Sequence, residues 1–116
     1  MGMDVYYDPE KFGLTTIGEA DFSSGSYEFD LFVVWQDNAT GDLLWGQDSG
    51  CSCPSPFDFQ GVGDLTRGTP HEAAAAIQAR LAERDEYDIK YGYGETEAAD
   101  LIAKIMALPA SAGSRT

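Results

Sequence analysis

The ten residues at positions 27–36, YEFDLFVVWQ, decide the fold of this chain. Aromatic and aliphatic side chains stand at every second position from Tyr27 to Trp35, which is the alternation of a β-strand with one buried face. Phe32 and Val34 place two further apolar side chains on the opposite face. We therefore predict a central strand that is covered on both faces at this end.

Strand signals flank this run on both sides. Residues 14–22 combine apolar positions with β-branched threonine and isoleucine, and a serine-rich turn at residues 23–26 separates them from the central strand. Residues 37–42 have the composition of a hairpin loop, and residues 43–47 return as a third strand. The sequence predicts a three-stranded antiparallel meander. Residues 87–93 alternate weakly and fit either a short fourth strand or an aromatic loop.

The hydrophobic period changes in the second half of the chain. Thr69 and Glu72, on either side of a proline, form the pattern of a capping box, which predicts a helix from here to about Arg84. A second helix is predicted with Thr96 as its cap and apolar residues at helical spacing. Pro109 ends that helix.

Strands that precede helices are typical of the α+β class. We expect one domain over residues 1–109, in which an antiparallel three- to four-stranded meander packs against two C-terminal helices. A small polar tail is expected at residues 110–116. A chain of 116 residues is long enough to bury one such core.

The charge of the chain is strongly negative and unevenly placed. Residues 1–66 carry 12 acidic side chains and one basic side chain, Lys11, whereas residues 67–116 carry 8 acidic and 6 basic side chains. A net charge of −13 opposes binding to nucleic acid or to a membrane surface and favours a partner protein with a basic surface. A solvated acidic face without a partner is the alternative.

Two pairs of acidic residues also favour a partner protein with a basic surface. Glu19 with Asp21, and Glu28 with Asp30, are two positions apart on predicted strands, so each pair shares a face with its Cα atoms about 6.8 Å apart. Such rows of carboxylates resemble an array of phosphates. They could therefore be recognised by a partner protein that normally binds nucleic acid. Ordinary solvent-facing strands of an acidic protein show the same pattern.

Both cysteines lie in one unusual segment, DSGCSCPSPF at positions 48–57. Cysteines two positions apart in an extended chain are at the far limit for a disulfide, so we expect free thiols. The prolines predict a rigid loop next to Trp45. We expect Trp35 and Trp45 to belong to the core, and a groove lined by Trp45 and that loop is the alternative. The candidate protein-binding residues are Trp45, Asp48, Cys51, Cys53, Pro54, Pro56 and Phe57 together with Glu19, Asp21, Glu28 and Asp30.

Catalytic and metal-binding patterns are weak. Cys51, Cys53, His71 and Asp48 are possible zinc ligands, but one Cys-x-Cys without a second pair is not the usual spacing. The single histidine has no sequence context that places it beside a cysteine. We expect a protein that is not an enzyme and needs no cofactor. A small metal- or thiol-dependent domain that uses Cys51 and Cys53 is the alternative.

Several motifs of the first half resemble a family of small proteins from tailed phages of actinobacteria that carry a domain of unknown function. The resemblance covers residues 6–65 and is carried by YDPEKFGL at positions 7–14, GE at 18–19, YEFD at 27–30, VVW at 33–35 and WGQDSGCSCPSPF at 45–57. It implies a phage origin and expression in the bacterial cytoplasm, and it implies no activity and no site residue.

These observations predict a non-enzymatic acidic phage accessory protein that binds a host or phage protein. Interference with a host defence or regulatory factor is one role that such binding would serve, and a minor virion component is a further alternative. No apolar run approaches the roughly 18 residues that cross a bilayer, and residues 1–5 lack the features of a signal peptide. We therefore expect a cytoplasmic protein of unassigned oligomeric state.

Overall fold

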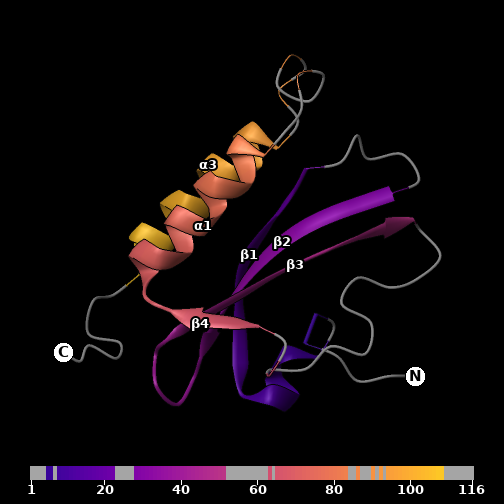
Figure 1. The fold of residues 1–116 in the computed structure, drawn as a ribbon. Helices are drawn as coiled ribbons and strands as arrows, with labels where there is room; N and C mark the ends of the chain where they lie inside the picture. Colours follow the sequence, from indigo (N-terminus) through magenta and orange to yellow (C-terminus); the bar gives the residue numbers. More distant parts are fainter. Residues whose placement is uncertain are drawn as a thin grey trace.

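The described part of the chain contains a four-stranded antiparallel sheet that packs against two α-helices (Figure 1). The computed structural model describes residues 5–6, 8–22, 28–51, 63, 65–83, 86, 90, 92 and 94–108, without the side chains of residues 28, 29 and 49–51. The elements are η1 (Pro9–Phe12), β1 (Leu14–Asp21), β2 (Glu28–Asp37), β3 (Leu43–Cys51), β4 (Thr66–Gly68), α1 (Pro70–Ala82) and α3 (Glu95–Met106). The strands are ordered β1-β2-β3-β4, which confirms the predicted α+β meander.

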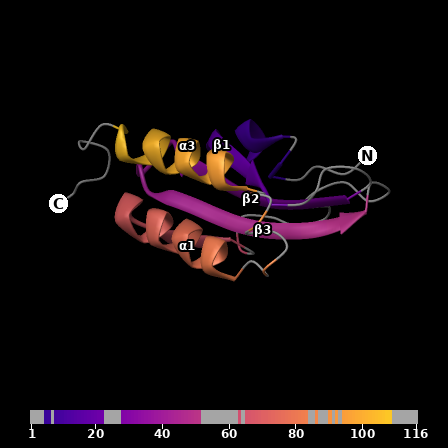
Figure 2. The same cartoon turned by 90° about the horizontal axis from the view of Figure 1, so that it is seen from above.

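The central strand β2 is buried on both sides, as its sequence predicts. Phe32 and Val34 face α1 and α3, and we call this the helix side of the sheet. Leu31, Val33 and Trp35 face the opposite way, toward the segment that precedes β1, and we call this the N-terminal side. Figure 2 shows the two helices lying side by side along the sheet.

Two separate clusters of buried residues result from this arrangement. The cluster on the helix side consists of Ala20, Phe22, Phe32, Val34, Leu43, Trp45, Ala73, Ile77, Ala98, Leu101 and Ile105. The cluster on the N-terminal side is Val5, Leu14, Leu31, Val33, Trp35 and Leu44, with Tyr6, Phe12 and Leu65 packed against it. Burial of both clusters supplies the main driving force for folding.

A β-bulge in β1 distributes its side chains between these clusters. The pairing with β2 shifts between Thr16 and Gly18, so Ile17 is the extra residue. Before the bulge, Leu14 packs on the N-terminal side; after it, Ala20 packs on the helix side. Strict alternation would have placed both of these even-numbered residues on the same face. The bulge therefore lets one strand serve both cores.

The segment that precedes β1 contains a short helix. Pro9 opens the short 3-10 helix η1, and Gly13 ends it with φ 74°, the left-handed conformation that glycine adopts without strain. This turn directs the chain into β1.

The two helices begin differently. The capping box that opens α1 is confirmed, because the Thr69 hydroxyl accepts from the Glu72 amide at 3.1 Å and the Glu72 carboxylate accepts from the Thr69 amide at 2.9 Å. The prediction that Thr96 caps the second helix is wrong. Gly94 occupies that cap with φ 83°, and no side chain bonds to it, so α3 starts at Glu95.

The strands also differ from prediction at one edge. β3 continues four residues beyond the predicted end at Gln47, because residues 28–31 of β2 offer it further partners. The fourth strand of the described sheet is β4, which the sequence did not indicate. Of residues 87–93, only Lys90 and Gly92 are described. Neither described helix is long and apolar enough to cross a membrane.

Candidate protein-binding surface

The acidic residues that the sequence grouped together lie on different sides of the sheet. Glu19 is opposite Val33 and Asp21 is opposite Leu31, so both lie on the N-terminal side. Asp30 is on the helix side, where its carboxylate forms an ion pair with Arg80 of α1. Glu19 and Asp21 therefore share one side of the sheet, and Asp30 lies on the other.

Asp30 belongs to the contact between the sheet and α1. The Arg80 side chain is only 13% exposed and the Asp30 side chain 31% exposed, so the pair is partly shielded from water. The Arg80 guanidinium also lies 4.5 Å from the centre of the Phe22 ring, a favourable cation–π distance. This placement gives Asp30 a structural role and offers no support for it as a binding residue.

Three other acidic residues come together on the N-terminal side. In the register of the sheet, Asp21 of β1 and Asp48 of β3 both stand opposite Leu31 of β2. Strands are spaced about 4.8 Å apart, so the two aspartates are separated by about 10 Å across the sheet. Glu19 lies two residues along β1 on the same side. We call Glu19, Asp21 and Asp48 the acidic patch.

The acidic patch is tied to its surroundings. The Tyr6 hydroxyl donates to a Glu19 carboxylate oxygen at 2.8 Å, which links the N-terminal segment to β1. The Asp21 carboxylate accepts from the Asp30 amide at 3.2 Å. Glu19 is exposed, and Asp21 and Asp48 are partly exposed, so their charges reach solvent. β1, β2 and β3 contain no lysine or arginine, which leaves the strands themselves uniformly negative.

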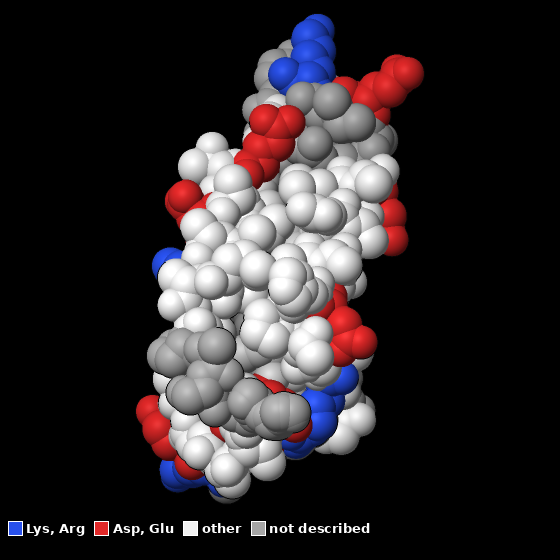
Figure 3. Space-filling view, turned by 90° about the vertical axis from the view of Figure 1, so that its left-hand side faces the viewer, with Lys and Arg blue, Asp and Glu red and all other residues white. Residues whose placement is uncertain are grey.

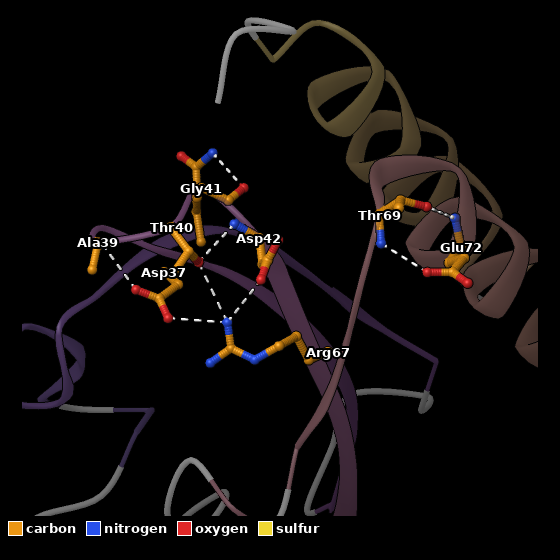
Figure 4. A network of polar contacts seen from close by, with 9 residues as sticks. Asp37, Ala39, Thr40, Gly41, Asp42, Arg67, Thr69 and Glu72 are labelled. Carbon is orange, nitrogen blue, oxygen red and sulfur yellow. Dashed lines mark hydrogen bonds and ion pairs between the residues drawn. The ribbon is translucent and has the colours of Figure 1, made fainter. Parts of the chain in front are cut away.

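A second charged cluster lies at the hairpin between β2 and β3 (Figure 4). Arg67 of β4 places its Nη1 atom 3.0 Å from an Asp37 oxygen and 3.1 Å from an Asp42 oxygen. The Ala39 amide donates to the other Asp37 oxygen at 2.8 Å. This hydrogen bond, together with the Arg67 guanidinium, lowers the pKa of Asp37, although partial burial opposes the effect.

The same contacts raise the pKa of Arg67, first through its hydrogen bond to Asp37 and then through Asp42. Arg67 also lies 3.4 Å from the Thr40 hydroxyl. The cluster thus connects β4 to the hairpin loop and satisfies the two aspartates locally. The sequence indicated Asp37 and Asp42 only as loop residues, and no short-range signal pointed to Arg67.

The remaining predicted site residues fall into two groups. Trp45 is 8% exposed and belongs to the helix-side core, which confirms the core interpretation and does not support the groove. The backbone of Glu28 lies in β2 and that of Cys51 in β3. The side chains of both, and all of Cys53, Pro54, Pro56 and Phe57, lie outside the described residues, so their roles remain predictions.

Histidine, cysteine, aspartate and glutamate residues all occur in the part of the chain that the structure describes. Within that part, no three histidine, cysteine, aspartate or glutamate side chains are grouped so that they could hold a metal ion. His71 is exposed at the second position of α1. Because Cys53 lies outside that part, a thiol- or metal-dependent role for Cys51 and Cys53 is still a prediction, which metal analysis with thiol titration can decide.

The family can now be stated. A family model described as a domain of unknown function (DUF7574) matches residues 3–108, which is most of the chain. The chain belongs to the DUF7574 family. This agrees with the expected domain of unknown function. Comparisons with curated proteins and with solved structures gave no match.

The outer surface of the helices in this DUF7574 domain differs from the acidic patch. Figure 3 looks onto that surface and shows a largely uncharged area, with acidic and basic side chains mainly toward its margins. The exposed residues of the two helices include Ala75, Ala79 and Ala82 of α1 and Ala99 and Ala103 of α3. Within the described residues, the sheet therefore offers a more strongly charged candidate surface than the middle of the helix pair.

Proposed function

We propose that this DUF7574 chain is a non-enzymatic accessory protein of a tailed phage that binds a host or phage protein through the acidic patch. The observation that carries the proposal is the gathering of Glu19, Asp21 and Asp48 on one side of the sheet from two different strands. A basic surface on the partner is the natural complement to this patch and to the net charge of −13.

The placement of the arginines supports this choice of surface. Arg80 is engaged with Asp30 on the helix side, and Arg67 is engaged with Asp37 and Asp42 at the hairpin. These contacts balance acidic residues that stabilise the fold. The acidic patch lies at other positions of the sheet and is at least partly exposed, so its charge can reach a partner.

The phage origin and the site of action are supported by the motifs of residues 6–65, which resemble proteins of tailed phages of actinobacteria. A protein made during infection would meet its partner in the host cytoplasm. We propose that binding interferes with a host defence or regulatory factor. Electrostatic attraction would speed association, so the on-rate should fall as the salt concentration rises.

The proposal is tested by capture from an actinobacterial host lysate with the tagged full chain at graded salt. We expect a partner that saturates at low salt and is lost at high salt. The triple variant Glu19→Gln, Asp21→Asn, Asp48→Asn should lose most of that binding.

The matched control removes the same number of charges from exposed positions outside the sheet. It combines Glu83→Gln, Glu86→Gln and Asp100→Asn, all of which are exposed. This variant should retain the partner. Failure to recover any saturable partner would contradict a binding function, and equal binding by both triple variants would contradict the acidic patch as the site.

A further inference from the structure

In the described part of the chain, the outer edge of β3 is only partly paired. β4 pairs with residues 43–45 at the start of β3, whereas β3 itself continues to Cys51 (Figure 1). On its inner side, β3 pairs with β2 over residues 28–36 without a register shift. Among the described residues, no strand pairs with the outer side of residues 46–51.

The hydrogen-bonding pattern shows which backbone groups face outward there. The Asp37 amide donates to the Asp42 carbonyl at 2.8 Å, so these two residues form a hydrogen-bonded pair of the antiparallel ladder. Such pairs alternate along the ladder, which directs the backbone groups of Asp48 toward β2. The amide and carbonyl groups of Gln47 and Ser49 must then point away from β2, toward the outer edge of β3.

The opposite edge of the sheet is blunted. β1 contains the bulge between Thr16 and Gly18, which interrupts a regular row of backbone groups. The outward-facing amide of Asp21 already donates to a carboxylate oxygen of Glu97 in α3, at 2.5 Å. A bulge and a bonded amide are features that hinder the addition of a further strand. No register shift interrupts β3 along its pairing with β2.

We propose that the outer edge of β3 at residues 46–51 binds an extended basic segment of the partner as an added β-strand. The inference rests on the proposed function and names the form of the partner. Side chains of an added strand alternate between the two sides of the sheet, so lysines or arginines at every second position would lie next to Asp48, with Asp21 and Glu19 beyond it.

Charge favours this occupant over a second copy of the chain. Two copies that paired their β3 edges around a twofold axis would bring both Asp48 residues to the same side of the joint sheet. Like charges close together across strands are destabilising, and each chain carries a net charge of −13. A basic strand gains from the same charges.

The test uses a fluorescein-labelled synthetic peptide of alternating lysine and valine, titrated onto the full chain by fluorescence anisotropy. Two control peptides separate the contributions: one carries glutamate for each lysine, and one is N-methylated at every backbone amide and keeps all charges. We expect saturable binding of the first peptide only, with at least about a tenfold loss on N-methylation, because several strand hydrogen bonds disappear together.

Protein variants test the edge itself. Gln47→Pro removes one outward amide without touching the bonds to β2 and should weaken binding about fivefold, whereas Gln47→Thr keeps that amide and should bind within about twofold of the original. Hydrogen exchange gives a second measurement that needs no variant. The Gln47 and Ser49 amides should exchange rapidly in the free chain and become protected when the peptide binds.

The contradicting outcomes can be told apart. Equal binding of the N-methylated peptide would overturn strand addition while leaving charge recognition intact. Protection of the Gln47 and Ser49 amides in the free chain would also overturn it, because the edge would then be occupied by this chain or by a second copy, which sedimentation distinguishes. Undiminished peptide binding by the triple acidic-patch variant would instead contradict the proposed binding surface.

Discussion

The described elements that cover the two sides of the sheet are of different kinds. The helix side lies under two helices of 13 and 12 residues, whereas the described residues on the N-terminal side are those of the segment before β1, with the four-residue η1, and Leu65. The helix side takes its charged residue, Asp30, into a contact with Arg80. The N-terminal side keeps Glu19, Asp21 and Asp48 at its solvent-facing end.

This difference indicates a division of roles within one sheet. Helices can cover a whole face and bring their own compensating cations, so that side is suited to stability. On the N-terminal side, the described residues leave Glu19 exposed and Asp21 and Asp48 partly exposed. The surface of the N-terminal side can serve recognition if the core beneath it is as stable as the core on the helix side.

The largest effect is expected when one large buried side chain is truncated on each side of the sheet. The two losses of unfolding free energy show whether both cores contribute equally to stability. Phe32→Ala on the helix side and Trp35→Ala on the N-terminal side should each lower the unfolding free energy by about 3–5 kcal/mol, because both side chains are fully buried. Urea denaturation measures the loss.

The exposed substitution Gln47→Ala serves as the control and should change stability by no more than about 0.5 kcal/mol. If Trp35→Ala proves far milder than Phe32→Ala, the N-terminal side is a peripheral layer. The two cores would then contribute unequally to the stability of the fold.

Two glycines allow the packing around the start of α3 to be compared with the packing around the end of η1. Gly94 and Gly13 both have positive φ, so Gly→Ala at either costs about 1–2 kcal/mol in backbone strain. A Cβ atom at Gly94 would also collide with the Phe22 ring, whereas a Cβ atom at Gly13 meets nothing within 4 Å.

Gly94→Ala should therefore be more destabilising by about 1–3 kcal/mol, the usual cost of overpacking. Thermal unfolding of the two variants measures the difference. Equal losses would show that the start of α3 moves aside easily, contrary to a tightly packed helix side.

A smaller effect is expected at the link between the N-terminal segment and the acidic patch. Tyr6→Phe removes the hydrogen bond to Glu19 and should cost about 0.5–1.5 kcal/mol, the net value of one such bond. Hydrogen exchange should show faster opening of residues 8–14 with little change in α1. The control Glu19→Gln keeps an acceptor oxygen, so it should open this segment less than Tyr6→Phe does.

The smallest effect concerns pH and the hairpin cluster. The folded pKa of Asp37 lies below its unfolded value, so the contribution of this group is present above the ordinary aspartate pKa of about 3.9 and is lost as the pH falls through the folded pKa. Arg67→Gln removes one of the causes but leaves the larger one, the Ala39 amide.

The variant should therefore lose less than about 1 kcal/mol at neutral pH, since Arg67 is well exposed, and a smaller amount at about pH 3. Urea denaturation at the two pH values measures this. A loss that is equally large in acid would show that Arg67 stabilises the hairpin by packing and not through the charge of Asp37.

The sequence by itself determined the features that depend on neighbouring residues. Alternation in residues 27–36 predicted the doubly buried strand, and the spacing of Thr69 and Glu72 predicted the capped start of α1. These patterns act over a few residues, so the chain displays them directly. The two tryptophans were also correctly favoured as core residues, since large aromatic side chains bury the most area.

Only the tertiary structure decided which residues meet across the sheet. The bulge at Ile17 sends Glu19 and Asp21 to the N-terminal side, and the extended register of β3 brings Asp48 beside them. A shift of one residue moves every later side chain to the other face, and such a shift is set by distant packing partners. The pairs Arg80 with Asp30 and Arg67 with Asp37 likewise join residues far apart in the chain, which no local pattern could indicate.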